Sequence, residues 1–470
     1  MSNPINACTR NHVNPLVLVT ATLLLGTAIS APWQSSWNGS SLQASTHLLD
    51  LTGDGVTDDH AALQQMINSG QGDIHLTKGI YRLSQPLVIE LDRVGYTSIH
   101  GSGVAVLKMD GPGPAIRVVG THYKSADPGG FMENVWEKQR MPLIDGIGIT
   151  ATHPEADGIE ATGTMQLTVS RTHIRGCRHA IRLFENNRNV IITDCHLYEN
   201  RGIGVFLDDV NLHQINVSGS HISYNGGGGI VSVKGNVRNL QVSGCDIESN
   251  MSVDGVCGSD LPTANVLLDC REGAAGIAEI AITGCTIQHN SQVPGSANIR
   301  MVGNSLPSSA APDRPVQEGH LTITGNVFSD VAVNVHLKDC RGVTMTGNTF
   351  WMGYEYNLLV EQTSHLVMAA NNFDRNPRYD YGTATTTKNL ILFQQCEDCT
   401  LSGIHAAHIH SAPAAVTIQD CRRMHVTGNT ILDCEPISLL VKNTTESRIE
   451  DNLISTTSGQ GMVVEQSQEQ

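Results

Sequence analysis

One short phrase recurs along most of the chain, and it constrains the fold more than any other feature of the sequence. In each copy, apolar and polar residues alternate, the chain turns at a corner that is often Gly-Asn or Gly-Cys, and one more apolar residue follows. The copies occupy residues 167–174, 190–197, 215–222, 240–247, 280–287, 321–328, 343–350, 366–373 and 424–431. Most copies start 22–25 residues apart, which is too short a repeat for a pair of helices. Alternation with a period of two is typical of β-strands.

A second apolar strand precedes most copies of the phrase. These strands occupy residues 180–184, 204–208, 230–234, 265–269, 334–338 and 357–361. Aromatic residues make up only 4% of the chain, so the core must be assembled from Val, Ile, Leu and small side chains in many similar layers. Two or three short strands per repeat, with no helix between them, predict an all-β fold: a right-handed parallel β-helix, a solenoid of about 11–13 coils.

The corner of the phrase holds a cysteine in the earlier coils and an asparagine in the later ones. The cysteines are Cys195, Cys245 and Cys285, and the asparagines are Asn326, Asn348, Asn371 and Asn429. Residues at equivalent positions stack in a solenoid. We therefore expect internal ladders of buried thiols and amides at these corners. The chain has twelve cysteines, but their regular spacing argues against disulfides.

The N-terminal part of the chain resembles a known family. Residues 48–67 read LLDLTGDGVTDDHAALQQMI and residues 74–83 read IHLTKGIYRL. Both look like the N-terminal signature of the pectate-lyase-like right-handed parallel β-helix superfamily, which includes polygalacturonase-like hydrolases, pectate lyases and phage tailspikes. The resemblance implies a β-helix with an N-terminal cap and a carbohydrate polymer as substrate. We expect Asp58 to cap a short helix that starts near Asp59 and whose apolar face covers the open end of the first coil.

The first thirty residues have the features of an export signal. Arg10 lies in a polar start, an apolar run begins at Leu16, and Ala28-Ile29-Ser30 supplies small residues for cleavage. The apolar run is shorter than the roughly 20 residues that span a bilayer, although an uncleaved anchor is the alternative interpretation. The predicted organisation is a signal peptide over 1–30, a cap with the first coils over 31–100, and the β-helix over 101–470. The expected location is secreted, periplasmic or cell-surface, with no membrane attachment after cleavage.

The net charge excludes one class of partner. Lys and Arg number 29 against 45 Asp and Glu, which gives a net charge of −16. A basic surface of the kind that binds nucleic acid is therefore not expected. The expected partner is a polysaccharide, and the protein is expected to be a monomer or a homotrimer.

Charged residues gather on the outward face of the strands that precede the phrase. When these strands are aligned on their apolar pairs, with Val231 and Val233 pointing inward, one outward column holds Asp208, Lys234 and Asp269. Asp208 and Asp269 are then two coils apart, about 9.6 Å between backbones at the strand spacing. Inverting glycosidases place their two carboxyl groups roughly 6.5–9.5 Å apart.

The predicted catalytic residues are therefore Asp208, Asp209, Asp269 and Lys234. Lys234 would keep the base ionised, and Asp209 at the following turn would substitute for either carboxylate. Polygalacturonase-like hydrolases also use aspartates on one β-helix face, including an adjacent pair that Asp208-Asp209 matches. Their Asn-Thr-Asp, Gly-His-Gly and Arg-Ile-Lys signatures have no counterpart here.

Other charged residues near this face are candidates for substrate binding. They are Arg182, Glu185, Arg300, His336 and Lys338. The repeat stretches to 40 and 41 residues around the same coils, and we expect the inserted segments 249–264 and 304–319 to form the walls of a cleft.

Three alternatives to a hydrolase stay open. A polysaccharide lyase or an epimerase that acts on uronic acids would use Lys234 or Arg182 as the base. Such an enzyme would hold Ca²⁺ through Asp208, Asp209 and Asp269, whereas the hydrolase needs no cofactor or metal. A binding stalk or adhesin is the third alternative, because fold does not fix function. In that case the charged face is a solvated array of salt bridges.

Overall fold

The computed structural model describes residues 50–466, except residues 126, 253–257, 273–275, 291–292, 305–306, 309–310 and 316–317. These described residues belong to one compact unit. The predicted signal peptide over 1–30 and the start of the predicted cap lie outside the described residues. Within the described residues, no helix is long and apolar enough to cross a membrane.

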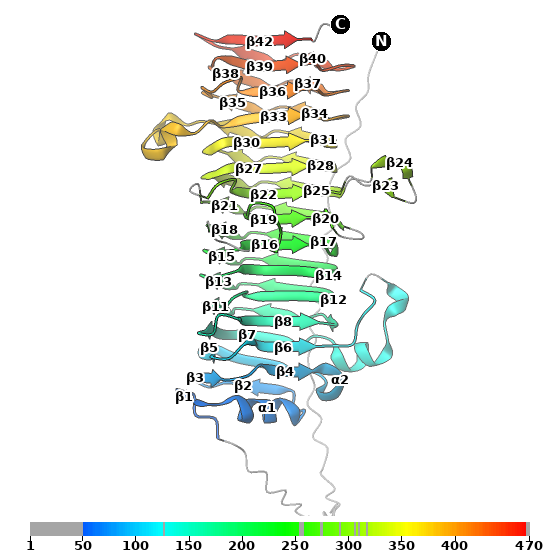
Figure 1. Ribbon diagram of the computed structural model, residues 1–470, viewed down its shortest axis with the longest axis vertical. Coiled ribbons are helices and arrows are strands. Elements are labelled where there is room, and N and C mark those ends of the chain that lie inside the picture. The colour runs from blue at the N-terminus through cyan, green and yellow to red at the C-terminus, as the bar shows by residue number, and fades with distance from the viewer. Residues whose placement is uncertain are drawn as a thin grey trace, which may run out of the picture. The chain divides into compact units, whose positions relative to one another are not determined.

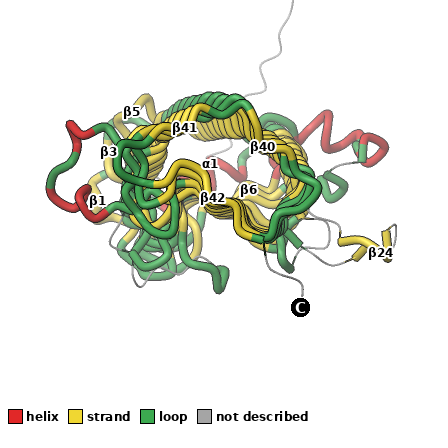
Figure 2. The backbone as a smooth tube through the Cα atoms, turned by 90° about the horizontal axis from the view of Figure 1, so that it is seen from above, coloured by secondary structure: helices red, strands yellow, loops and turns green. Residues whose placement is uncertain are grey.

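The described chain winds into a parallel β-helix whose strands stack coil upon coil (Figure 1), as the repeat predicts. Seen from above, the strands of successive coils superimpose into three sheets joined by turns (Figure 2). Only the hairpin of β23 (Pro307–Ser308) and β24 (Ala311–Pro315) is antiparallel among the described strands.

The first sheet carries the strands that precede the repeated phrase. Its strands are β4 (Leu87–Glu90), β6 (Gly113–Val119), β8 (Ala156–Thr162), the first halves of β12 (Ile181–Thr193) and β14 (Ile203–Ser218), β16 (Gly228–Val233), β19 (Ala264–Asp269), β22 (Ala297–Val302), β27 (Val331–Lys338), β30 (Gly353–Glu361), β33 (Leu390–Gln394), β36 (Val416–Gln419), β39 (Ile437–Lys442) and β42 (Gln460–Glu465).

The second and third sheets carry the two halves of the phrase. The second sheet contains β2 (Asp73–His75), the first halves of β5 (Ser98–Met109) and β7 (Leu143–Ala151), β10 (Thr168–Ser170), the second halves of β12 and β14, β17 (Asn236–Ser243), β20 (Gly276–Thr283), β25 (Glu318–Thr324), β28 (Cys340–Thr346), β31 (Ser364–Ala369), β34 (Thr400–Ser402), β37 (His425–Thr427) and β40 (Arg448–Glu450). The third sheet contains β1 (Asp54–Asp58), β3 (Gly79–Leu83), the second halves of β5 and β7, β11 (His173–Arg175), β13 (His196–Tyr198), β15 (His221–Ser223), β18 (Asp246–Glu248), β21 (Thr286–Gln288), β26 (Val327–Ser329), β29 (Thr349–Phe350), β32 (Asn372–Asp374), β35 (His405–Ala407), β38 (Thr430–Leu432) and β41 (Leu453–Ser455).

The remaining elements lie at the N-terminal end or in loops. They are α1 (His60–Asn68), α2 (Leu91–Val94), the 3₁₀-helices η1 (Pro128–Gly130), η3 (Pro377–Tyr379) and η4 (Gly382–Thr386), and the short π-helix η2 (Val135–Gln139). The two-residue strand β9 (Thr164–Met165) pairs with the middle of β12. The helix α1 buries Leu63 and Ile67 against the first coil, as the sequence predicts. Asp58 accepts a hydrogen bond from the backbone N–H of His60 at the helix start. Asp59 is buried and instead accepts from the N–H groups of Thr52 and Gly53.

Stacked polar side chains fill the corners between sheets. Nδ2 of Asn326 donates to Oδ1 of Asn348 at 3.0 Å, and Asn348 donates to Asn371 at 2.9 Å, so the predicted amide ladder is confirmed. A second ladder, which the repeat does not reveal, lies before the first sheet with donor–acceptor distances of 2.7–2.9 Å. It runs through Asn200, Asn225, Asn250, Asn265, Asn298, Asn334 and Asn357.

The cysteines behave as buried thiols. The ten cysteines among the described residues are all free and buried. Burial raises the pKa of Cys177, Cys340 and Cys399 to about 12. These thiols therefore stay protonated and contribute to packing.

The register of β16 differs from the predicted one by a single residue. Phe206 pairs with Val231, and Asp208 pairs with Val233, so both valines point outward while Ile230 and Ser232 point inward. The prediction that Val231 and Val233 face the core is therefore wrong. Both valines are still buried, because they join an outer apolar cluster with Phe206 and Leu267. A slip of one residue exchanges the two faces of a strand.

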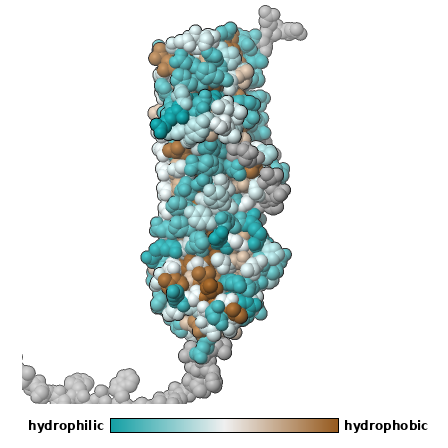
Figure 3. Space-filling model, turned by 90° about the vertical axis from the view of Figure 1, so that its left-hand side faces the viewer, coloured by the Kyte–Doolittle hydropathy of each residue, from teal (hydrophilic) through white to brown (hydrophobic). Residues whose placement is uncertain are grey.

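The surface is polar over most of one side. In the view of Figure 3, hydrophilic side chains cover most of the face, and apolar side chains gather towards the N-terminal end. Exposed apolar residues of the N-terminal strands and their connections include Val56, Ile80 and Val104.

Candidate functional site

Charged side chains form a continuous stack over four coils of the first sheet. Arg117 on β6 donates to Glu160 on β8 at 3.0 and 2.9 Å. Arg182 on β12 donates to the other oxygen of Glu160 at 3.1 Å and to Asp208 on β14 at 2.9 and 2.6 Å. We call Arg117, Glu160, Arg182 and Asp208 the charged stack. Positive and negative side chains alternate along it, so each carboxylate of the charged stack contacts at least one guanidinium.

Burial differs along the charged stack. The side chain of Glu160 is 3% exposed, whereas that of Asp208 is 30% exposed. Burial opposes the charge on Arg182, but its hydrogen bonds to Asp208 and Glu160 outweigh that effect and raise its pKa. Of the two carboxylates in the charged stack, Asp208 is therefore the one that is accessible to solvent.

A second ion pair lies beside the charged stack. Arg178 donates to buried Asp157 at 2.9 and 2.5 Å, and the N–H of His179 donates to the same carboxylate at 2.9 Å. Nδ1 of His179 accepts from the N–H of Ile203 at 3.1 Å. Burial lowers the pKa of His179 to about 4, so the ring is neutral at neutral pH. Its ring lies 5.1 Å from that of Phe206 on the outer face of the sheet.

Sequence patterns missed these partners. None of these residues was predicted, because they precede or overlap the first clear repeat. They are Asp157, Glu160, Arg178 and His179. The strand β8 was nevertheless readable, because Ile159 and Ala161 are its buried inward pair. Extending the outward column one coil towards the N-terminus would have placed Glu160 beside Arg182.

Asp209 and Lys234 lie in the turn after the first sheet. Asp209 is exposed and adopts the left-handed conformation with φ 44°, and Lys234 does the same with φ 65°. Nζ of Lys234 contacts Glu272 at 2.9 Å, and this partner raises the pKa of the lysine. The predicted position of Lys234 between the two aspartates is wrong, because Val233 occupies it. A lysine base needs a lowered pKa, so the geometry gives Lys234 no role as a base.

Asp269 is in the predicted column but is not open to a substrate. It lies two coils from Asp208, with Val233 between them. Its carboxylate accepts from Oγ of Ser259 at 2.5 Å and from Arg271 at 2.9 and 2.8 Å, and its residue is 5% exposed. Burial alone would raise its pKa, but these hydrogen bonds outweigh burial and lower the pKa. The structure therefore separates Asp269 from the open carboxylates.

The predicted substrate-binding residues fall into two groups. Arg182 and Glu185 lie near Asp208, and Glu185 accepts from the hydroxyl of Thr162 at 2.8 Å. Arg300, however, is 4% exposed and donates to the carbonyls of Pro262 and Gly295, both at 2.7 Å. Its guanidinium anchors two loops, which corrects the prediction that it contacts substrate.

His336 and Lys338 lie farther along the first sheet. Arg300 donates to Nδ1 of His336 at 3.2 Å, and Nε2 of His336 lies 2.9 Å from Glu361. Burial and the neighbouring Arg300 lower the pKa of His336. Lys338 is half-buried in the same column as Asp269. This group is therefore an internal network several coils from Asp208.

The described part of the first insertion covers the sheet. Leu261 packs on the outer apolar cluster, while Ser259 and Pro262 bond to Asp269 and Arg300. These contacts hold residues 259–262 against the strands, so this part of the segment does not form the predicted cleft wall. Residues 253–257 of the segment lie outside the described residues. The second insertion is described only in part, and its described part contains the antiparallel hairpin of β23 and β24.

The described residues offer no group of three or more His, Cys, Asp and Glu side chains that could hold a metal ion. The calcium alternative requires Asp208, Asp209 and Asp269 to converge. Asp269 is committed to Arg271 and lies two coils away, so these residues do not fit a shared calcium site.

Comparison with known proteins supports the architecture. The family model described as "Right handed beta helix region" matches residues 140–270 and 269–409. A search of curated proteins found no matching sequence. A mutant tailspike protein of E. coli bacteriophage HK620, solved with a pentasaccharide, has a TM-score of 0.52 at 12% identity, over 85% of this chain and 75% of the tailspike. The A-module of a mannuronan C-5 epimerase from Azotobacter vinelandii has a TM-score of 0.47 at 12% identity, over 89% of this chain and 98% of the module. Since the family model covers more than half of the sequence, the chain belongs to the right-handed β-helix family.

Proposed function

We propose that this chain is an exported glycoside hydrolase that cleaves a polysaccharide at the open end of the charged stack. The observation that carries the proposal is the pair of adjacent aspartates at this end: partly exposed Asp208, held on the sheet by Arg182, and exposed Asp209 in the turn that follows. Sites on regular elements of a scaffold are more precise than sites on loops. A tailspike of the same fold was solved with a pentasaccharide, which supports a glycan as the substrate class.

The two aspartates have different surroundings, and hydrolysis needs two carboxyl groups in different states. Asp208 accepts two hydrogen bonds from Arg182, which fix its carboxylate, and it acts as the base that activates water. Asp209 lies at the exposed turn and acts as the acid that protonates the leaving oxygen. Glu160 is a positioning residue, since it fixes the guanidinium of Arg182 from the opposite side.

The lyase and epimerase alternatives have weaker support. Their proposed bases, Lys234 and Arg182, both have raised pKa values because each is paired with carboxylates. Proton abstraction requires the deprotonated form, which these pairings disfavour. Non-catalytic binding is the second candidate, and the observation that favours it is the pairing of both stack carboxylates with arginine.

A polysaccharide screen tests the proposal. The secreted protein is incubated with neutral and uronate polymers, with and without a calcium chelator, while new reducing ends and the ultraviolet absorbance of unsaturated uronates are followed. We expect new reducing ends without absorbance, and no effect of the chelator. Chelator-sensitive absorbance would replace the hydrolase with a lyase. Binding without any product across the panel would replace it with a binding protein.

A further inference from the structure

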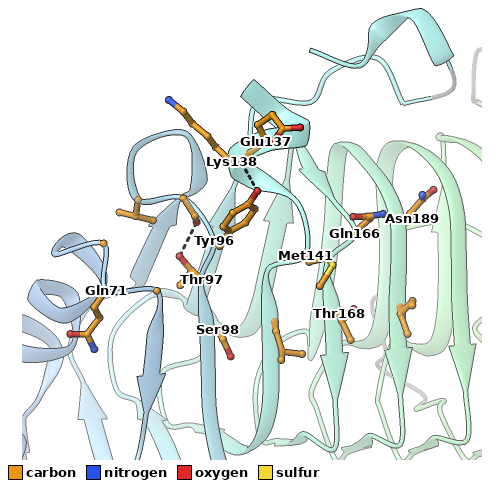
Figure 4. Close-up of a pocket in the computed structure, with 16 residues that line it drawn as sticks. Gln71, Tyr96, Thr97, Ser98, Glu137, Lys138, Met141, Gln166, Thr168 and Asn189 are labelled. Carbon is orange, nitrogen blue, oxygen red and sulfur yellow. Dashed lines mark hydrogen bonds between the residues drawn. The ribbon is translucent and has the colours of Figure 1, made fainter. Parts of the chain in front are cut away.

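A long groove lies on another sheet, away from the charged stack. Its larger part, about 1020 Å³ in volume, lies along the second sheet at the N-terminal end, between the turn at Gly70–Gly72, residues 94–98 and the η2 loop (Figure 4). A smaller part of about 310 Å³ continues along later coils. Asn189 and Ile191 line both parts, so the two form one groove that runs along successive coils.

Amide side chains repeat along this groove at the spacing of the coils. Gln166, Asn189, Gln214 and Asn239 occupy one bend in four successive coils, all with positive φ. Asn216 and Gln241 pair in register beside them on the second sheet. Neighbouring coils are about 4.8 Å apart, so the amides form a grid of regularly spaced donors and acceptors. Gln214, Asn216 and Gln241 are exposed.

Two of these amides have an acceptor that is not used. Oε1 of Gln166 and Oδ1 of Asn189 are buried and accept no hydrogen bond from the residues that the structure describes. Both side chains line the larger part of the groove, and Figure 4 shows them at the bends of adjacent coils. A buried acceptor without a donor is unfavourable. Turning either amide outward at its bend would let its oxygen accept a hydrogen bond from a hydroxyl group of a ligand in the groove.

The N-terminal end of the groove is aromatic and apolar. Tyr96 is 49% exposed and Met141 is 64% exposed, and both line the groove. The guanidinium of Arg140 lies 5.7 Å from the ring of Tyr96 and 5.4 Å from that of Trp136, and it joins the two rings into one platform. The apolar faces of sugar rings stack on such platforms.

The lining is almost free of charge. Glu137 and Lys138 are the two charged residues of the lining and have opposite signs, and Arg140 of the adjoining platform adds one positive charge. A uronate polymer or a nucleic acid would need a surplus of cations here. Uncharged amides next to an aromatic platform instead match the hydroxyl groups and apolar faces of neutral sugars.

We propose that this groove binds an extended chain of neutral sugars parallel to the β-helix axis, with about one sugar unit per coil at the 4.8 Å strand spacing. The inference rests on the proposed function and deepens it, because it names the substrate class and separates anchoring from cleavage. The second sheet holds the polymer, while the first sheet carries the reacting carboxylates.

Calorimetry tests this proposal. It measures the affinity of the full chain for neutral hexose oligomers of increasing length. The variant Asn189→Gly combined with Gln214→Gly removes two amides without straining the backbone, because glycine adopts positive φ freely. The matched control is Gln395→Gly, an exposed glutamine with φ 53° in a turn of a later coil. We expect affinity to rise with length up to about four units, to fall at least tenfold in the double variant, and to stay unchanged in the control.

Other outcomes separate this proposal from the proposed hydrolase. Tighter binding of a uronate oligomer than of a neutral one would overturn the neutral-glycan assignment. Equal glycan affinity of the wild type and the double variant would refute the groove as the binding site, even if hydrolysis is observed. Loss of self-association in the double variant, without any glycan binding by wild type, would instead assign the surface to a second copy of the chain. Intact groove binding without hydrolysis of any polymer would leave the groove in place and refute the hydrolase.

Discussion

Arg182 donates two hydrogen bonds to Asp208, at 2.9 and 2.6 Å, although the two residues lie on neighbouring coils and are 26 residues apart in sequence. The in-register partner of Arg182 is Phe206, so the guanidinium reaches diagonally to the carboxylate. The same guanidinium contacts Glu160 on the preceding coil. One arginine thus fixes two carboxylates that the sequence keeps far apart, and it leaves Asp208 at the exposed end.

Removing one amide from the buried ladder should destabilise the protein strongly. Asn250 donates to the carbonyl of Ile222 at 2.7 Å and to Asn265 at 2.9 Å, and it accepts from Asn225. Asn250→Ala leaves these groups buried without partners, and we expect a loss of about 3 kcal/mol in unfolding free energy. Urea denaturation measures this change in unfolding free energy. Asn216→Ala, at an exposed amide, is the control and should change stability by less than about 0.5 kcal/mol.

His179 should make stability fall as the pH drops from about 6.5 to about 4. Burial lowers its folded-state pKa to about 4 from an ordinary value of 6.5. The unfolded chain therefore binds a proton in this range before the folded chain does, so the stabilisation present above 6.5 is lost as pH falls. His179→Asn keeps an acceptor for the N–H of Ile203 and should flatten this part of the profile. An unchanged slope in thermal melts across the range would contradict the assignment.

Arg300 should control the mobility of two loops. Its hydrogen bonds to the carbonyls of Pro262 and Gly295 are the contacts that Arg300→Leu removes. We expect amide hydrogens in residues 258–263 and 293–296 to exchange at least tenfold faster, since local opening becomes easier. Hydrogen exchange followed by mass spectrometry measures the change. Lys338→Met, at a half-buried residue of the same sheet, should leave both loops protected.

The ten described cysteines should react slowly in the folded protein. They are free and buried, and burial raises the pKa of Cys177, Cys340 and Cys399 to about 12. A thiol-specific reagent should label them only after urea unfolds the chain, and a reductant should not alter the melting temperature. Rapid labelling of these ten in native buffer, located by peptide mapping, would show that the ladders are accessible.

The sequence predicted the features that follow from periodicity. The alternation in the repeated phrase identifies the strands, and the Gly-Asn corner identifies the ladder of Asn326, Asn348 and Asn371. The ladder through Asn200 and Asn225 was missed, because its asparagines stand outside the phrase.

The candidate site was predicted only in part, for two physical reasons. The strand β16 is apolar on both faces, so alternation could not fix its register, and Lys234 was placed one position from its true site. Ion pairing depends on side-chain reach across coils and turns, which is why the bonds of Asp269 to Arg271 and of Arg300 to loop carbonyls were not anticipated.

The most direct measurement is a comparison of hydrolysis by Asp208→Asn and Asp246→Asn on the polymer that the wild type cleaves. Asp246 is a partly exposed aspartate on the third sheet, near His221, and serves as the matched control. General acid–base catalysis contributes about 10²–10⁴-fold to rate, so we expect Asp208→Asn to lose at least about 100-fold in kcat while polymer affinity is retained. Asp246→Asn should cleave like the wild type. Equal rates for the two variants would contradict the assignment of the reaction to the charged stack.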